Sequence, residues 1–144
     1  FRGRRVAYNA TDSQSGYNTL RRRVAPDTVN DYFSRVIFSG SHRQLLMDVK
    51  GGVGAIAAID CVTWALLKRH ESERLAGLAV IDRTPLTPGL PLIPSPNPSP
   101  ETLNAIRDAL HELVDAPEYR EVRDAVLIDG FSVVTREAYA SLSA

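Results

Sequence analysis

Apolar and polar positions in the first 84 residues follow two alternating patterns, one typical of strands and one typical of helices. Strand-like runs lie at residues 4–9, 34–40, 54–60 and 75–84, and helix-like runs lie between them at residues 16–24, 27–33, 41–51 and 61–70. This order of elements is typical of parallel strands joined by right-handed helical crossovers. The pattern therefore predicts an α/β fold built on a parallel sheet with flanking helices.

A change of composition divides the chain near residue 84. Residues 84–100 hold seven of the nine prolines, a density that excludes a helix and favours an extended segment, with residues 91–94 as an edge strand. We therefore expect an α/β lobe at residues 1–83. Residues 84–144 are expected to form a proline-rich crossing segment followed by C-terminal helices.

The region after the prolines contains helix signals. Ser99 is a suitable N-cap, and Pro100 suits the first helical position. The apolar stripe expected for this helix consists of Leu103, Ile106, Leu110, Leu113 and Val114. A second helix is predicted over residues 118–128, closed by Gly130, and a short strand or loop with a last helical turn follows it.

Composition excludes several classes of function. Lys plus Arg and Asp plus Glu both total 17, so no overall positive charge favours nucleic acid. The single cysteine, Cys61, excludes an intrachain disulfide, and no spacing of His, Cys, Asp and Glu predicts a metal site. No apolar run reaches the roughly 20 residues of a membrane-spanning helix. Because the chain starts at Phe1 and carries no signal peptide, we expect it to be part of a longer protein.

Polar turns follow three of the predicted strands. They read "DSQSG" at residues 12–16, "SGSH" at 39–42 and "DCVT" at 60–63, and each opens a helix. The carboxyl ends of parallel strands share one edge of the sheet, where α/β proteins bind ligands. Helix starts there present unpaired backbone N–H groups that suit an anion. Each turn taken alone is also explained as an ordinary helix cap.

Individual side chains in these turns have both a structural and a functional interpretation. His42 lies in the first turn of its helix, where the helix dipole disfavours a protonated imidazole, so it suits the role of a neutral donor to an oxyanion. Asp60 is either a helix cap or an acceptor for a donor group on a ligand. Tyr8 and Tyr17 either wall a pocket or simply pack. We assign Cys61, together with Trp64, to the core.

Three longer segments resemble a known family. "VAYNATDSQSGYNTLRR", "FSRVIFSGSHRQLLMDVKGGVGAIAAIDCVTWALLKR" and "PGLPLI" are similar to the phosphate/phosphonate-type solute-binding proteins of ABC transporters. The resemblance implies the type II periplasmic-binding-protein fold, in which two α/β lobes close on a ligand in the cleft between them. Residues 1–83 would correspond to the second lobe, and residues 84–144 would return to an incomplete first lobe.

The resemblance also implies a site and a function. The Ser-x-Ser turn at Ser13, Gln14 and Ser15 would hold anionic oxygens, and the family's ligand-contacting histidine matches His42. The full candidate set for ligand binding is Tyr8, Ser13, Gln14, Ser15, Ser41, His42 and Asp60. The protein would bind a small anionic or zwitterionic solute outside the cytoplasm and deliver it to a membrane permease, with no cofactor and no covalent step. Self-association is expected because the chain looks truncated.

Two other functions remain open from the sequence. An effector-binding domain of a transcription regulator uses a similar two-lobed fold, and an upstream helix-turn-helix would identify it. An enzyme would use Cys61 as nucleophile and His42 as base, which requires the thiol to be activated.

Overall fold

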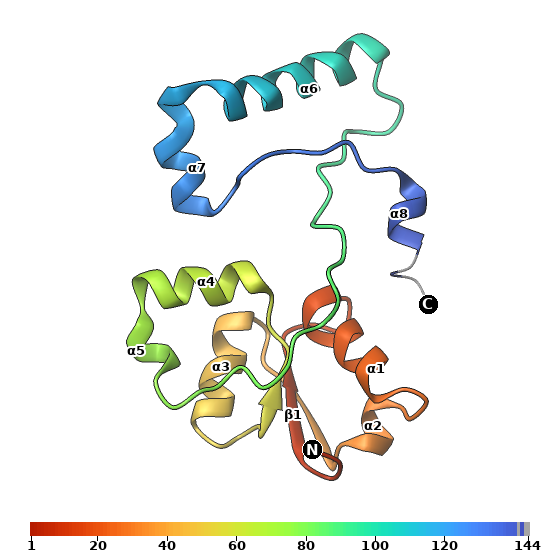
Figure 1. Ribbon diagram of the computed structural model, residues 1–144. Helices are drawn as coiled ribbons and strands as arrows, with labels where there is room; N and C mark the ends of the chain where they lie inside the picture. The colour runs from red at the N-terminus through yellow and green to blue at the C-terminus, as the bar shows by residue number, and fades with distance from the viewer. Residues whose placement is uncertain (141, 143–144) are drawn as a thin grey trace. The chain divides into compact units, whose positions relative to one another are not determined.

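The computed structural model describes residues 1–140 and 142, and the chain divides into two compact units after Thr84. Unit 1 comprises residues 1–84 and unit 2 begins at Pro85. Figure 1 labels helices and strands of the two units.

Unit 1 is built on a parallel sheet of three strands in the order β2-β1-β3. The strands are β1 (Arg5–Tyr8), β2 (Arg35–Phe38) and β3 (Ile56–Ala57). In the register, Tyr8 at the end of β1 is paired with Phe38 at the end of β2. The predicted α/β fold with a parallel sheet is confirmed.

Helices connect the strands in the predicted order. A π-helical turn η1 (Gln14–Asn18) runs directly into α1 (Thr19–Val24), and the other helices of unit 1 are α2 (Val29–Tyr32), α3 (His42–Lys50), α4 (Cys61–His70) and α5 (Ser72–Leu75). The helix starts follow from side-chain caps. Thr28 caps α2, Ser41 caps α3 and Asp60 caps α4, each accepting from a backbone N–H three residues later.

Two apolar cores cover the opposite faces of the sheet. Successive residues of a strand point to opposite faces, so Val6 and Ala7 belong to different cores, although both are fully buried. The Val6 core contains Leu20, Val24, Val29 and Phe33, from α1, α2 and the chain after α2. The Ala7 core contains Leu45, Leu46, Leu67 and Leu75, from α3, α4 and α5. Figure 1 shows α1 and α2 on one side of β1 and α3 on the other.

The predicted fourth strand at residues 75–84 is wrong. Leu75 ends α5, Gly77 turns the chain with a φ of +84°, and residues 76–84 form neither helix nor strand. Apolar composition alone does not make a strand, because the backbone N–H and C=O groups need a partner edge. Val80 and Ile81 are 49% and 59% exposed, so they join neither core.

Unit 2 contains helices without a buried core among its described residues. The helices are α6 (Pro100–Asp115), η2 (Pro117–Tyr119), α7 (Arg120–Val126) and α8 (Arg136–Ala140). The predicted start of α6 is confirmed, since Ser99 Oγ accepts from Thr102 N at 3.2 Å and Pro100 is the first helical residue. No described residue of these helices is buried.

Three further predictions in unit 2 have clear outcomes. Residues 91–94 do not form an edge strand, and Leu92 and Ile93 are 69% and 81% exposed. The helix at 120–126 ends at Leu127, which takes a left-handed φ of 62°, rather than at Gly130. The sequence allowed either a short strand or a loop after the second helix, and residues 131–135 form a loop.

Among the described residues, no helix has both the length and the apolar character that a membrane span requires.

Candidate functional site

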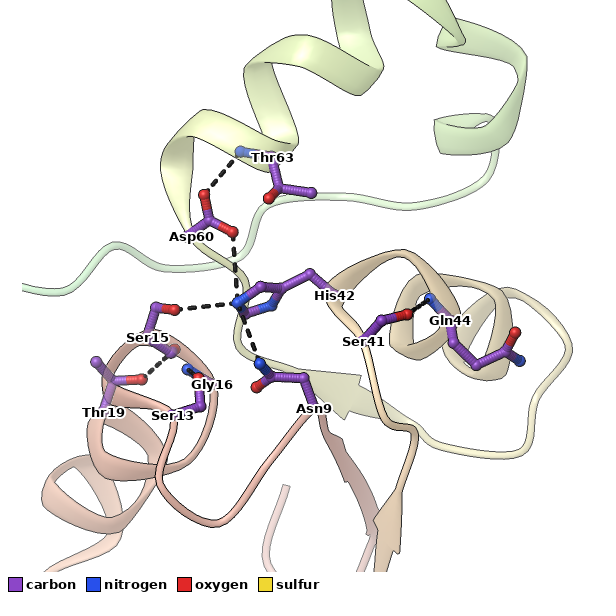
Figure 2. Close-up of polar contacts among 10 residues, drawn as sticks. All are labelled: Asn9, Ser13, Ser15, Gly16, Thr19, Ser41, His42, Gln44, Asp60 and Thr63. Carbon is purple, nitrogen blue, oxygen red and sulfur yellow. Dashed lines mark hydrogen bonds and ion pairs between the residues drawn. The ribbon is translucent and has the colours of Figure 1, made fainter. Parts of the chain in front are cut away.

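Four side chains from four segments of unit 1 meet at the carboxyl edge of the sheet (Figure 2). Asn9 follows β1, Ser15 lies in η1, His42 opens α3 and Asp60 caps α4. We call these four residues the His42 cluster. The sequence-based expectation that the three polar turns gather on one edge therefore holds in the geometry of unit 1.

One ring nitrogen of His42 is the centre of this cluster. Nε2 lies 3.1 Å from Ser15 Oγ, 3.4 Å from Asn9 Nδ2 and 3.4 Å from Asp60 Oδ2. The His42 side chain is 18% exposed and the Asp60 side chain 29% exposed. The cluster is thus mostly covered by protein but still open to solvent.

A π-helical turn presents Ser15 to His42. The backbone N–H groups of Tyr17 and Asn18 both donate to Ser13 O at 3.0 Å, which widens the first turn by one residue. Ser13 Oγ accepts from Gly16 N at 3.0 Å, and Thr19 Oγ1 donates to Ser15 O at 2.6 Å. These bonds fix the backbone on both sides of Ser15 and leave its hydroxyl directed to His42 (Figure 2).

Gly16 makes room for Asn9, a cluster residue that the sequence analysis did not include. A Cβ at position 16 would lie 1.8 Å from Asn9 Oδ1 and 3.0 Å from Asn9 Cγ. While Asn9 keeps this position, only glycine fits at residue 16. The signal in the sequence was the glycine within "DSQSG", but its partner seven residues earlier cannot be read from local spacing.

Asp60 is a helix cap, as one of its two interpretations expected, and its second oxygen faces the cluster. Its Oδ1 accepts from Thr63 N at 2.7 Å and caps α4, while its Oδ2 faces His42 Nε2. The cap fixes the carboxylate in place, so that the second oxygen is held toward the cluster (Figure 2).

The other candidate residues lie outside the cluster. Ser41 Oγ accepts from Gln44 N at 3.1 Å, and in Figure 2 it points away from Ser15. Tyr8 packs against Tyr17, with ring centroids 5.2 Å apart, and belongs to the side chains around the Val6 core. Gln14 Nε2 is buried and has no hydrogen-bond partner among the described residues.

The arrangement around His42 does not match a nucleophilic relay. In a Ser-His-Asp relay the serine and the carboxylate contact opposite nitrogens of the ring. Here Ser15 and Asp60 share Nε2, and Nδ1 is buried without a partner among the described residues. The geometry is that of a set of hydrogen-bonding groups around one point.

The placement of Cys61 in the core is wrong. It is exposed at the start of α4, because this helix buries only Leu67 fully and turns its first residue to solvent. Among the described residues, no hydrogen bond joins Cys61 to His42. Trp64, by contrast, packs against the Ala7 core. No group of three or more His, Cys, Asp and Glu side chains suited to a metal occurs in the described part of the chain.

The neighbours of Nε2 favour a proton on that nitrogen. A ring lone pair facing the Asp60 carboxylate would be repelled, whereas an N–H is attracted to it. Asn9 suits this tautomer too, because its amide can turn to offer Oδ1, which is now buried without a partner among the described residues. His42 thus presents a donor at the centre of the cluster.

A comparison with protein families matches almost the whole chain. The family model described as "ABC transporter, phosphonate, periplasmic substrate-binding protein" matches residues 1–139. No curated protein matches the chain.

Proposed function

The chain belongs to the family of periplasmic substrate-binding proteins of phosphonate ABC transporters, and from this premise we propose that its solute binds at the His42 cluster. Proteins of this family bind a small solute outside the cytoplasm and work with a membrane permease. It is not an enzyme family.

The donors at the cluster suit the anionic end of a solute. Ser15 offers a hydroxyl and His42 an N–H at Nε2, and these two atoms lie 3.1 Å apart, close enough to contact one oxyanion together. The first N–H groups of η1 have no acceptor inside the helix, and the Ser13 hydroxyl beside them keeps its own proton to donate. Together they form a fixed set of donors for phosphonate-like oxygens.

One observation supports this proposal more than any other. Ser13, Ser41 and Asp60 all cap helices, so their presence is explained by folding alone. Ser15 and His42 cap nothing, yet they come from different helices to a contact of 3.1 Å. Because helix capping does not account for this contact, we assign the anion to these two residues and leave Ser41, which caps α3, out of the proposed site.

Asp60 supplies the acceptor at the same place. Its free oxygen, Oδ2, needs a donor from any solute that displaces its contact with His42. A zwitterionic or hydroxyl-bearing solute meets this need, and a solute with acceptors only does not. The proposal therefore favours phosphonate-like compounds that carry at least one donor.

Thermal-shift measurements on the protein with methylphosphonate and 2-aminoethylphosphonate test the proposal. A solute at 100 times its Kd stabilises the native state by about 2.7 kcal/mol and raises the Tm. We expect Ser15→Ala to weaken binding by about tenfold to a hundredfold, because one charge-assisted hydrogen bond is lost. The double variant Ser13→Ala, Ser15→Ala should weaken it further.

Ser41→Ala is the matched control for this experiment. Like Ser13→Ala, it removes a serine that caps a helix. It should lower the free energy of unfolding by about 1 kcal/mol, and with it the Tm measured without solute. The shift produced by the solute should stay the same, since Ser41 lies outside the cluster. A shift that is unchanged in the Ser13, Ser15 double variant would disprove the proposed site.

A further inference from the structure

We propose that the amino edge of the sheet in unit 1 binds the anionic surface of a membrane through Arg4, Arg5 and Arg35. We call these three residues the arginine edge. They lie at the starts of the parallel strands β1 and β2, at the opposite end of the sheet from the His42 cluster. This contact is independent of the solute that binds at the cluster.

The two units carry opposite charges, although the chain as a whole is neutral. Residues 1–84 contain 13 Lys and Arg and 8 Asp and Glu, whereas residues 85–144 contain 4 and 9. The formal net charge is therefore +5 for unit 1 and −5 for unit 2. Eleven of the 13 basic residues in unit 1 are arginine, whose planar fork of donors matches the oxygens of a phosphate group. Unit 1 is thus the part of the chain that an anionic surface attracts.

Two of these arginines are direct neighbours across the sheet. In the register of β1 and β2, Arg5 is paired with Arg35, and both residues are exposed. Val6 and Val36, the next pair, both pack on the side of the Val6 core, so Arg5 and Arg35 both point to the opposite face. Two like charges on adjacent strands repel each other, and folding of the sheet does not account for this pair.

No carboxylate among residues 1–140 and 142 neutralises the arginine edge. Arg5 Nη2 donates to the carbonyl oxygen of Gly52 at 2.6 Å, and Arg4 and Arg35 have no hydrogen bond or ion pair through their side chains in this part of the chain. Lys50, two residues before Gly52, also donates to backbone carbonyl oxygens only. The positive charges at this edge are therefore held near one another without counter-charges.

The acidic residues of the adjoining segment have partners of their own. Gly3 N donates to Tyr32 O at 2.8 Å, which places the end of α2 beside the start of β1. Asp27 forms an ion pair with Arg2, and Asp31 accepts from the hydroxyl that caps α2. These two carboxylates thus have donors other than the arginine edge.

The exposure of the arginine edge favours a membrane surface over a small anion. All three residues are exposed, so they do not enclose a ligand as a buried site does. A bilayer with acidic lipids presents many phosphates in one plane, and each Lys or Arg near such a surface strengthens binding about fivefold. The family works with a membrane permease, so a membrane is close to the protein. Contact through the amino edge leaves the carboxyl edge, with the His42 cluster, open to the solute.

Co-sedimentation with lipid vesicles at low ionic strength tests this contact. Vesicles of equal parts phosphatidylglycerol and phosphatidylcholine should bind the protein, and vesicles of phosphatidylcholine alone should not. Added salt should release the protein, because salt screens exposed charges. Arg35→Gln should weaken binding about fivefold, and the triple variant Arg4→Gln, Arg5→Gln, Arg35→Gln about a hundredfold. The Tm of Arg35→Gln should stay the same or rise, since the repulsion with Arg5 is removed.

Arg107→Gln is the matched control. Arg107 is exposed in α6 of unit 2, and its replacement lowers the net charge of the protein by the same amount as Arg35→Gln. Binding to the anionic vesicles should stay unchanged. If Arg107→Gln weakens binding as much as Arg35→Gln does, binding follows the net charge alone and the inference is wrong. If the triple variant does not fold, the double variant Arg4→Gln, Arg35→Gln replaces it, because neither side chain holds a hydrogen bond among the described residues.

Two further outcomes overturn the inference. Equal binding to both kinds of vesicle would show that the arginines do not read the charge of the surface. Binding to poly-glutamate, combined with no binding to the anionic vesicles, would show that the arginine edge binds an acidic protein and not a membrane.

Discussion

At the scale of single residues, Gly16 is the position on which the geometry of the cluster depends most directly. In Gly16→Ala the new Cβ would meet Asn9 Oδ1 at 1.8 Å, so the Asn9 amide must leave its place beside His42. Such overpacking costs about 1–3 kcal/mol, and an amide at the end of a side chain yields toward the lower value. We expect a lower Tm and weaker binding of 2-aminoethylphosphonate, measured by thermal unfolding and calorimetry.

A double-mutant cycle identifies the cause of this loss. In an Asn9→Ala background the obstructing amide is absent, so Gly16→Ala should then have a much smaller effect on stability. Gly89→Ala is the control, because no atom lies within 4 Å of its added Cβ. An equal loss of stability in both backgrounds would show that the backbone of η1, and not Asn9, sets the need for glycine.

The sequence predicted part of the cluster and missed part of it, for reasons that are physical. The sequence could predict Ser15, His42 and Asp60, because helices that begin after parallel strands start at the same edge of the sheet. Asn9 was missed because it acts through a contact with η1 that depends on the π-helical turn. Ser41 was included because a cap and a ligand contact have the same local sequence.

At the scale of elements, one carboxylate joins the helices on the Ala7 side of the sheet. Glu71, between α4 and α5, accepts from Arg43 of α3 and Arg74 of α5. Desolvation raises the pKa of Glu71, but the two arginines outweigh it and hold that pKa below its ordinary value of 4.5. A carboxylate whose pKa is lower in the folded state stabilises the fold above its unfolded pKa and loses this contribution as the pH falls.

The sign of this linkage gives a prediction for Glu71→Gln. The parent protein should lose stability on going from pH 7 to pH values below about 4.5, and the variant should lose less over the same range, because it has no carboxylate to protonate. Urea unfolding at several pH values measures both. Glu73→Gln, an exposed neighbour in α5, should keep the pH profile of the parent. A variant profile that coincides with the parent's would refute the role of Glu71.

Helices that begin at a capping residue could be predicted from the local sequence. Strands could not always be predicted, because a strand needs a neighbouring strand that is distant in the sequence. The caps at Ser41, Asp60 and Ser99 begin helices as expected, because a cap acts within three residues. Residues 75–84 were apolar enough for a strand, but pairing depends on an edge that the local sequence does not reveal. Exposure of Val80 and Ile81 is the direct consequence.

At the scale of the whole molecule, the two units differ in what holds them together. Both cores, from Val6 to Leu75, and the whole His42 cluster lie in unit 1, whereas the described helices of unit 2 bury no residue. The first residues of unit 2 are exposed to solvent, with Leu86 and Leu90 almost fully exposed. Predicted self-association would cover part of the apolar surface of unit 2, and it stays a prediction.

Because of this difference, we expect limited proteolysis to degrade unit 2 faster than unit 1. Thermolysin should cut first near Leu86 and Leu90, where the backbone is exposed and outside helices and strands. A fragment close to residues 1–84 should then resist digestion, since its backbone opens only with its cores, whereas the fragment from unit 2 should be degraded further. Mass spectrometry of the time course identifies both. If the fragment of unit 1 disappears as fast as that of unit 2, its two cores do not form a unit that is stable by itself. If the fragment persists, its thermal unfolding can be measured with and without 2-aminoethylphosphonate. A higher Tm with the solute would show that unit 1 alone binds it.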